Sequence, residues 1–146
     1  MSRMLLQRGH SVYIIDVNEE ELAHTVNVHL KDYPKRFSAI CDVTNVDQVR
    51  LVAEDAVRKL GIVDCLVNDA AIARPTMANP MTDYSTWDEY NKFIQVNLIS
   101  AFTVSQAFAS KMAKDGAIVH ISSTRWQQSQ ADWYVHPFVV SPSNVK

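Results

Sequence analysis

Glycine is scarce in this sequence: its 146 residues contain only three, Gly9, Gly61 and Gly116. Each stands between a helix-like and a strand-like segment, so each is expected to end a helix. None belongs to a glycine-rich turn whose backbone N–H groups could hold a phosphate group at the start of a helix. The scarcity also argues against a flavodoxin-like binding domain, which would need an anion loop after its first strand.

Strong charge and cysteine patterns are lacking too. The formal net charge is −2, the isoelectric point is near 6.2 and no run of Lys or Arg exists, so composition gives no case for nucleic acid or an anionic membrane. Cys41 and Cys65 lie in apolar runs without zinc-ligand spacing, and we expect buried free thiols in a reducing compartment. Without a signal peptide or a stretch of ~20 apolar residues, we expect a soluble, cytoplasmic protein.

What is present is an alternation of strand-like and helix-like segments in a chain long enough for one domain. Short β-branched or apolar runs predict strands over residues 11–17, 37–41, 62–67 and 117–121. Helices are predicted to end near Leu6, to span residues 19–30, to follow a capping box that begins at Thr44, and to span residues 85–114. Four strands separated by helices predict an α/β fold, a doubly wound parallel sheet with helices on both faces.

The helices carry apolar stripes at a spacing of three and four residues. The stripe of the third helix comprises Val46, Val49, Ala53, Ala56, Val57 and Leu60. The stripe of the long helix comprises Trp87, Tyr90, Ile94, Leu98, Ala101, Ser105, Phe108 and Met112. Further apolar residues on the long helix, Phe93, Val96, Phe102 and Val104, suit either a second contact face for homo-oligomerisation or burial in the monomer. Prolines and hydroxyl residues predict a loop over 73–84, and the absence of periodicity predicts an irregular tail over 125–146.

Polar residues follow each predicted strand, where open parallel sheets bind their ligands. Asp16 could accept both ribose hydroxyls of NAD, or could be an acid at a helix start. Asp42, before Val43, could accept from an adenine amino group, or could lead into a helix cap. The small residues after Asn68 would let a cofactor approach the backbone, or would form a tight exit from the strand.

Two further polar positions are candidates for a site. Asn97 lies on the apolar stripe of the long helix, where an unpaired amide would cost about 1–3 kcal/mol, so something polar should face it. That partner is either backbone or a ligand. Ser122 and Ser123 follow the last strand, where hydroxyls could orient a carbonyl group or cap a turn.

Taken together, these residues resemble the middle of a short-chain dehydrogenase/reductase over residues 1–124, an NAD(P)-binding Rossmann-like domain. The resemblance implies that Asp16 holds the adenosine ribose and favours NAD over NADP, and that Asp42 and Val43 contact adenine. It implies that residues 68–71, in the family Asn-Asn-Ala-Gly, line the cofactor site. Asn97 would position a proton-relay water and Ser123 would orient the substrate carbonyl. Ala70 matches the family's Ala, whereas Asp69 would put a charge beside the nicotinamide end and Ala71 would add a methyl group where the backbone is expected to lie close to the cofactor.

The sequence also departs from the family pattern. It has no Gly-x-x-x-Gly-x-Gly turn, and Asp69 and Ala71 replace Asn and Gly. The position of the family's general-acid Tyr is His136, and that of its Lys is Val140. The family's first strand, at the centre of the sheet between the strands of residues 11–17 and 62–67, is missing, as are its C-terminal strands. Without the central strand we expect two half-sheets with exposed edges.

These departures leave two functions open. The first is an NAD(P)-dependent oxidoreductase, with NAD preferred, that interconverts an alcohol and a ketone or aldehyde and is catalytically impaired. The second is a non-catalytic pseudoenzyme or fragment, from altered splicing, an incorrect gene model or a decayed copy, that pairs through residues 85–114. We expect no metal ion, no nucleic acid and no membrane as partners.

Overall fold

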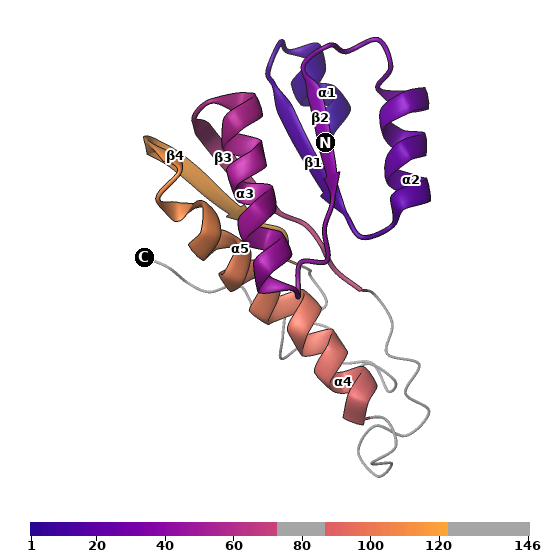
Figure 1. Ribbon diagram of the computed structural model, residues 1–146, viewed down its shortest axis with the longest axis vertical. Helices are drawn as coiled ribbons and strands as arrows, with labels where there is room; N and C mark the ends of the chain where they lie inside the picture. The colour runs from indigo at the N-terminus through magenta and orange to yellow at the C-terminus, as the bar shows by residue number, and fades with distance from the viewer. Residues whose placement is uncertain (73–86, 123–146) are drawn as a thin grey trace.

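The computed structural model describes residues 1–72 and 87–122 of the chain, so the predicted loop over 73–84, Ser123 and the predicted tail lie outside the described residues (Figure 1). The helices are α1 (Ser2–Gln7), α2 (Glu19–His24), α3 (Val46–Leu60), α4 (Trp87–Ile94) and α5 (Ser100–Ala109). Two π-helical turns, η1 (Thr25–His29) and η3 (Gln95–Ile99), continue α2 and join α4 to α5. The strands are β1 (Val12–Asp16), β2 (Arg36–Ile40), β3 (Val63–Asn68) and β4 (Met112–His120).

The strands form two separate parallel pairs within the described residues. β1 pairs with β2 in register from Val12↔Arg36 to Asp16↔Ile40. β3 pairs with β4, with an irregularity between Val63 and Cys65. No ladder joins one pair to the other in the part of the chain that the structure describes. The predicted parallel α/β architecture and the predicted division into two half-sheets are both confirmed.

One apolar core nevertheless unites the two pairs. Its buried residues come from α3, α5 and β3 and from the end of β2, and they are Cys41, Val49, Val52, Ala53, Ala56, Val63, Leu66, Val104 and Phe108. Tyr13 and Ile15 of β1 pack against the same core. In Figure 1, α3 lies beside both pairs, and α2 lies on the other side of the β1–β2 pair from α3. The predicted helices on both faces are therefore present.

The start of α3 differs from the prediction by one residue. The N-cap is Asn45, whose side chain accepts from the backbone N–H groups of Asp47 and Gln48, both at 3.1 Å. Thr44 instead bonds to the preceding Asp42. A capping side chain reaches the N–H groups two and three residues ahead, and Asn satisfies this geometry as well as Thr does. The apolar stripe is largely correct, although Val46 is exposed and Val52 is buried.

The predicted helix over 85–114 is wrong at its C-terminal end. α5 ends at Ala109, and β4 begins at Met112 rather than at residue 117. Gly116 lies within β4, so it does not end a helix. A Cβ at Gly116 would lie 3.0 Å from the carbonyl oxygen of Ala113 and 3.2 Å from that of Asp64, so this position needs glycine because backbone passes close by. Gly9 and Gly61, with φ of 87° and 84°, do follow helices as predicted.

The predicted stripe of the long helix is also wrong in part. The buried residues are Phe93, Ser100, Val104 and Phe108, whereas Trp87 and Leu98 of the predicted stripe are exposed. The π turn η3 adds a residue to the turn between α4 and α5, which shifts the phase of every later position relative to a regular helix. For Phe93 and Val104, which suited either a second contact face or burial in the monomer, the structure shows burial in the monomer.

The prediction for the cysteines is half right. Cys41 is buried, but Cys65 of β3 is exposed. Its ladder partner Ala117 of β4 is exposed as well. Both residues lie on the face of the β3–β4 pair opposite Leu66, which is buried against the core. Within the described residues no helix covers that opposite face.

Candidate functional site

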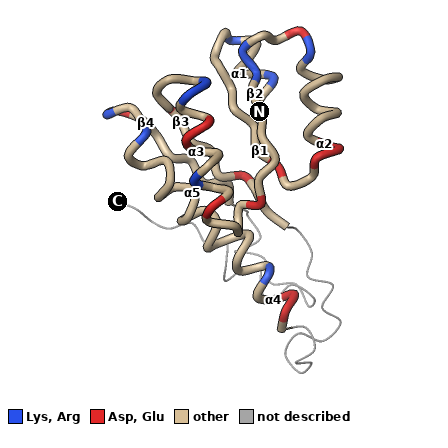
Figure 2. The backbone as a smooth tube through the Cα atoms, in the orientation of Figure 1, with Lys and Arg blue, Asp and Glu red and all other residues tan. Residues whose placement is uncertain are grey.

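Two carboxylates stand at the carboxyl ends of β1 and β2. Asp16 is the last residue of β1, and its carbonyl oxygen accepts a hydrogen bond from the N–H of Cys41 at 2.9 Å. The two strands are therefore still paired one residue before Asp42, which places Asp16 and Asp42 at the same end of the pair. Figure 2 shows acidic positions at this end of the β1–β2 pair and at the start of α2.

Asp16 is exposed and locally ordered. Its Oδ1 accepts from the backbone N–H of Asn18 at 2.9 Å, and the side chain of Asn18 caps α2 through the N–H of Glu21 at 3.1 Å. Oδ2 has no hydrogen-bond partner among the described residues. Asp16 is thus an acid at a helix start, which was the structural alternative. Its second oxygen is also available to a ligand, as binding of ribose hydroxyl groups would require.

The carboxylate of Asp42 accepts more hydrogen bonds than that of Asp16 does. Its Oδ1 accepts from Thr44 twice, from the hydroxyl group at 2.7 Å and from the backbone N–H at 2.9 Å. These bonds, the hydroxyl first, hold the pKa of the Asp42 carboxyl below its ordinary value. Asp42 therefore shapes the turn that leads to α3. The next residue, Val43, is half-buried against the core, which leaves little of its side chain for adenine.

Asn68 ties the carboxyl end of β3 to α5. Its Nδ2 donates to Oγ of Ser105 at 3.0 Å and to the carbonyl oxygen of Ala101 at 3.4 Å, and it lies 3.3 Å from Nδ1 of His120. The side chain therefore faces the helix layer. The following residues, Asp69, Ala70 and Ala71, are exposed at the strand exit.

The side chain of Asn97, in the π turn η3, is hydrogen-bonded to the backbone of Ile72. Its Oδ1 accepts from the N–H of Ile72 at 2.9 Å, and its Nδ2 donates to the carbonyl oxygen of Ile72 at 3.0 Å. The side-chain amide thus forms the two hydrogen bonds to Ile72 that the backbone of a neighbouring strand would form. It holds the backbone in place just after residues 68–71. This is the backbone-bonded alternative, and it makes Asn97 a positioning residue for that segment. No contact between Asn97 and Ser123 can be described, since Ser123 is outside the described residues.

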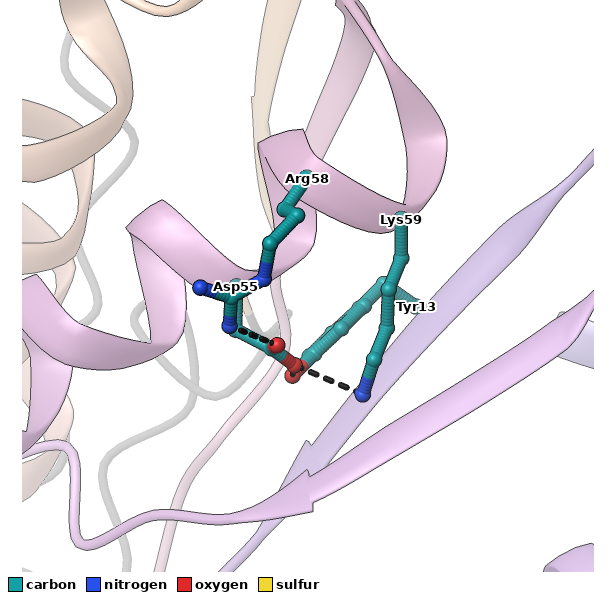
Figure 3. A network of polar contacts seen from close by, with 4 residues as sticks. All are labelled: Tyr13, Asp55, Arg58 and Lys59. Carbon is teal, nitrogen blue, oxygen red and sulfur yellow. Dashed lines mark hydrogen bonds and ion pairs between the residues drawn. The ribbon is translucent and has the colours of Figure 1, made fainter.

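Tyr13, Asp55, Arg58 and Lys59 form a polar network that sequence reasoning missed (Figure 3). The hydroxyl group of Tyr13 on β1 donates to the carboxylate of Asp55 on α3. Arg58 and Lys59 pair with the same carboxylate, Lys59 with Nζ 2.7 Å from Oδ2. Nζ of Lys59 also lies 5.5 Å from the centre of the Tyr13 ring. The i,i+4 spacing of Asp55 and Lys59 is a sequence signal for the ion pair, but no local pattern could have identified Tyr13.

The network shifts two pKa values in opposite directions. Hydrogen bonds from Lys59, Tyr13 and Arg58, in that order of size, lower the pKa of Asp55. Burial, followed by the hydrogen bond to Asp55, raises the pKa of Tyr13. The network lies at the α3 side of β1, away from the strand end that carries Asp16, so it holds the fold together and takes no part in the candidate site.

No metal site is found in the described ranges, where no three His, Cys, Asp or Glu residues are grouped suitably. None of the helices among the described residues is long and apolar enough to cross a membrane.

The comparisons with known proteins agree with this arrangement. A family model described as enoyl-(acyl carrier protein) reductase matches residues 1–136. A short-chain dehydrogenase from Mycobacterium smegmatis superposes with a TM-score of 0.83 over 95% of this chain and 58% of that chain, at 26% sequence identity. The chain belongs to the short-chain dehydrogenase/reductase family.

The curated proteins to which the chain is similar include dehydrogenases and reductases. The 7α-hydroxysteroid dehydrogenase of Escherichia coli is 32% identical over 117 residues, which are 80% of this chain and 44% of that protein. The 3-oxoacyl-(acyl carrier protein) reductase of Thermotoga maritima is 32% identical over 123 residues, 82% of this chain and 48% of that protein. This chain thus spans about half the length of the short-chain dehydrogenases/reductases it matches.

The described residues fit one part of the NAD(P) that this family uses. The exposed carboxylate of Asp16 at a strand end suits a pair of ribose hydroxyl groups. The diphosphate is not provided for: the two glycines with positive φ, Gly9 and Gly61, end helices, and N–H groups for a phosphate would be needed at a helix start. The described residues therefore suit the adenosine ribose and not the diphosphate.

Proposed function

We propose that this chain carries the adenosine-binding part and the Asn97 and Ser123 positions of an NAD-dependent oxidoreductase that interconverts an alcohol and a ketone or aldehyde, and that the 146 residues by themselves are catalytically impaired. The observation that carries the proposal is the exposed, ordered carboxylate of Asp16 at the end of β1, beside Asp42 at the end of β2. When bound, the nicotinamide cofactor supplies or accepts a hydride.

The preference for NAD over NADP rests on charge. A carboxylate that accepts the two ribose hydroxyl groups would face the 2′-phosphate of NADP at close range, and the two negative charges would repel. No described Lys or Arg hydrogen-bonds to Asp16, whose recorded partner is the N–H of Asn18. Among residues 1–72 and 87–122, therefore, no basic side chain bonded to Asp16 offsets the repulsion.

Impairment follows from the residues needed for proton transfer. The sequence has no Tyr followed by Lys four residues later, and an isolated Tyr with a pKa of ~10 is a poor general base at neutral pH. Asn97 can still hold the backbone of Ile72, and Ser123 would still present a hydroxyl group to a carbonyl. Orientation without a matched proton donor leaves the reaction slow.

The test is calorimetric titration of the purified chain with NADH and with NADPH. We expect NADH to bind about tenfold more tightly than NADPH, a difference of about 1.4 kcal/mol, and we expect Asp16→Asn to remove the difference. Asp32→Asn, which neutralises an exposed carboxylate away from the strand ends, should leave the preference unchanged.

The same samples decide the rest of the proposal. NADPH binding as tight as NADH binding would refute the role of Asp16. Turnover of a ketone by NADH in these samples would refute the impairment. A folded sample that binds neither cofactor would favour the second candidate, a pseudoenzyme that pairs through residues 85–114. That candidate draws on the exposed Phe102 and Leu98, which are 69% and 48% exposed.

A further inference from the structure

Two histidines lie side by side at the end of the helical segment formed by α2 and η1. His24 is the last residue of α2, and His29 is the last residue of η1. The centres of their imidazole rings are 4.9 Å apart, and the ring planes are nearly perpendicular, at 89°. Both residues are exposed. The segment therefore presents two imidazole groups together at the surface.

The π turn brings the two rings together. In a regular α-helix, residues five apart are rotated by about 140° from one another, so their side chains point to different faces. In η1 the N–H of Leu30 donates to the carbonyl oxygen of Thr25 at 3.0 Å, a hydrogen bond that spans five residues. The wider turn brings His29 next to His24. A spacing of five residues is therefore no metal-site signal in a sequence, and the pair exists only because of the π turn.

The backbone of the pair is held in place, and the rings remain available. The carbonyl oxygen of His29 accepts a hydrogen bond from Nη2 of Arg3 at 3.2 Å, which ties the end of η1 to α1. Among residues 1–72 and 87–122, neither imidazole ring takes part in a hydrogen bond or an ion pair. Imidazole nitrogens suit Zn²⁺, Cu²⁺ and Ni²⁺. Two available rings on an anchored backbone therefore suit an ion of this class.

The spacing of the rings matches that of two imidazole ligands on one metal ion. A zinc–nitrogen bond of ~2.0–2.1 Å puts the centre of each ring about 3.2 Å from the ion. Two such rings, separated by about 90–110° around the ion, have centres about 4.5–5.2 Å apart. The observed separation of 4.9 Å lies within this range. Edge-to-face packing accounts for the same contact without an ion, and it predicts no affinity for a metal.

We propose that His24 and His29 bind one divalent transition-metal ion, such as Zn²⁺, through both imidazole groups, with water in the remaining positions. Groups of three ligating side chains are absent from the described ranges, so the site is an open one that retains water. The first turn of α2 carries three glutamates, whose negative charge favours a cation on this segment. The pair lies beside α1, whereas Asp16 precedes the start of α2, so metal binding is separate from the candidate cofactor site.

Calorimetric titration of the whole chain with Zn²⁺ tests the proposal. Binding by both rings predicts that His24→Ala and His29→Ala each weaken the affinity at least about tenfold, because either change leaves a single protein ligand. His10→Ala and Cys65→Ser remove other exposed side chains that can bind zinc, and they should leave the affinity unchanged. Mg²⁺, which prefers oxygen ligands, should not compete.

The contrary results are equally definite. If only one of the two alanine substitutions weakens binding, a single imidazole holds the ion. If neither does, the ion lies elsewhere, and if the unmodified chain binds no Zn²⁺, the rings only pack against each other. Each of these three results would overturn the proposal. Should a variant lose its helix, NMR of the unmodified chain decides, because Zn²⁺ must shift the ring resonances of His24 and His29 together and leave those of His10 in place.

Exchanging the last two residues of η1 tests the role of the π turn. Val28→His combined with His29→Val keeps the composition and places the histidines four residues apart, the spacing at which a regular helix binds zinc. Because η1 is a π turn, we expect the exchange to weaken Zn²⁺ binding at least about tenfold. Binding as tight as that of the unmodified chain would show that the π turn does not build the site, and the proposed geometry would be wrong.

Discussion

Asn97 shows how one side chain can organise a strand exit. Its amide satisfies both the N–H and the C=O of Ile72, at 2.9 and 3.0 Å. The sequence predicted that a polar partner must face this amide, because an unpaired amide on an apolar stripe is costly. The presence of a partner is confirmed, and its identity as the backbone of Ile72 could come only from the folded chain, since 25 residues separate the two.

Replacing Asn97 should therefore destabilise the fold before it affects any chemistry. We expect Asn97→Ala to lower the free energy of unfolding by about 1–3 kcal/mol, because two backbone groups lose their partner. Asn97→Asp keeps the acceptor for the N–H of Ile72 but sets a carboxylate oxygen against its carbonyl oxygen, so we expect its loss to be at least as large as that of Asn97→Ala. Urea denaturation measures both, with Asn91→Ala, an exposed amide on the same helix, as the control. Equal stability of the two alanine variants would contradict this account.

At the scale of the element, the π turn η3 interrupts the regular helical geometry between α4 and α5. Apolar spacing along the sequence cannot reveal η3, because such a turn arises from packing and hydrogen bonding around it and not from composition. A regular helix drawn through residues 85–114 consequently placed Leu98 inside, although 48% of its surface is exposed. The observed buried residues, Phe93, Ser100, Val104 and Phe108, recur at helical spacing and share one face, which differs from the predicted stripe.

Two phenylalanines on this segment provide a matched test of which helix face is buried. Phe93 is fully buried, and Phe102 is 69% exposed. We expect Phe93→Ala to cost about 3–5 kcal/mol of unfolding free energy and Phe102→Ala less than about 0.5 kcal/mol. Thermal and urea denaturation of both variants measures the difference. If the two losses are similar, either the phase is wrong or Phe102 is covered by a second copy, which a shift in sedimentation on Phe102→Ala would identify.

At the scale of the whole molecule, the two strand pairs are linked by side chains and not by a ladder. α3 supplies more buried residues to the shared core than any other element does, and the hydroxyl group of Tyr13 on β1 bonds to Asp55 on that helix (Figure 3). Local patterns predicted the strands themselves, and the family resemblance predicted that they would form two half-sheets. How the halves are held together depends on contacts between residues more than forty positions apart in sequence.

This link makes stability depend on pH at both extremes. The pKa of Tyr13 is raised in the folded chain, so its contribution is complete below the unfolded value of ~10 and is lost as the pH rises above it. The pKa of Asp55 is lowered, so its contribution is complete above the unfolded value of ~3.9 and is lost as the pH falls below it. Between these values we expect a plateau in the unfolding temperature from these two groups.

Tyr13→Phe separates the alkaline effect. It keeps the ring and removes the hydroxyl group, so we expect a loss of about 0.5–1.5 kcal/mol at neutral pH and a flatter decline above pH ~10 than in the unmodified chain. Tyr33→Phe, at a half-buried tyrosine outside the network, is the control. Scanning calorimetry from pH 7 to 11 makes the measurement, and an unchanged alkaline slope in Tyr13→Phe would refute the assignment.

The sequence by itself determined the order of the strands, the approximate spans of β1 to β3, α2 and α3, the end of α1, and the strand-end positions of Asp16, Asp42 and Asn68. These features depend on neighbouring residues: alternation, caps and the polar residue that ends an apolar run. The family resemblance, also read from the sequence, predicted the missing central ladder, which the two separate pairs confirm.

Only the tertiary structure decided the features that depend on distant contacts. It placed Gly116 against the backbone of Asp64, turned the side chain of Asn68 toward Ser105, and left Cys65 exposed because no described element covers its face. It also paired Tyr13 with Asp55. Each of these contacts joins residues that are distant in the sequence. Local sequence patterns report only on neighbouring residues, so they cannot predict which distant segments will pack together.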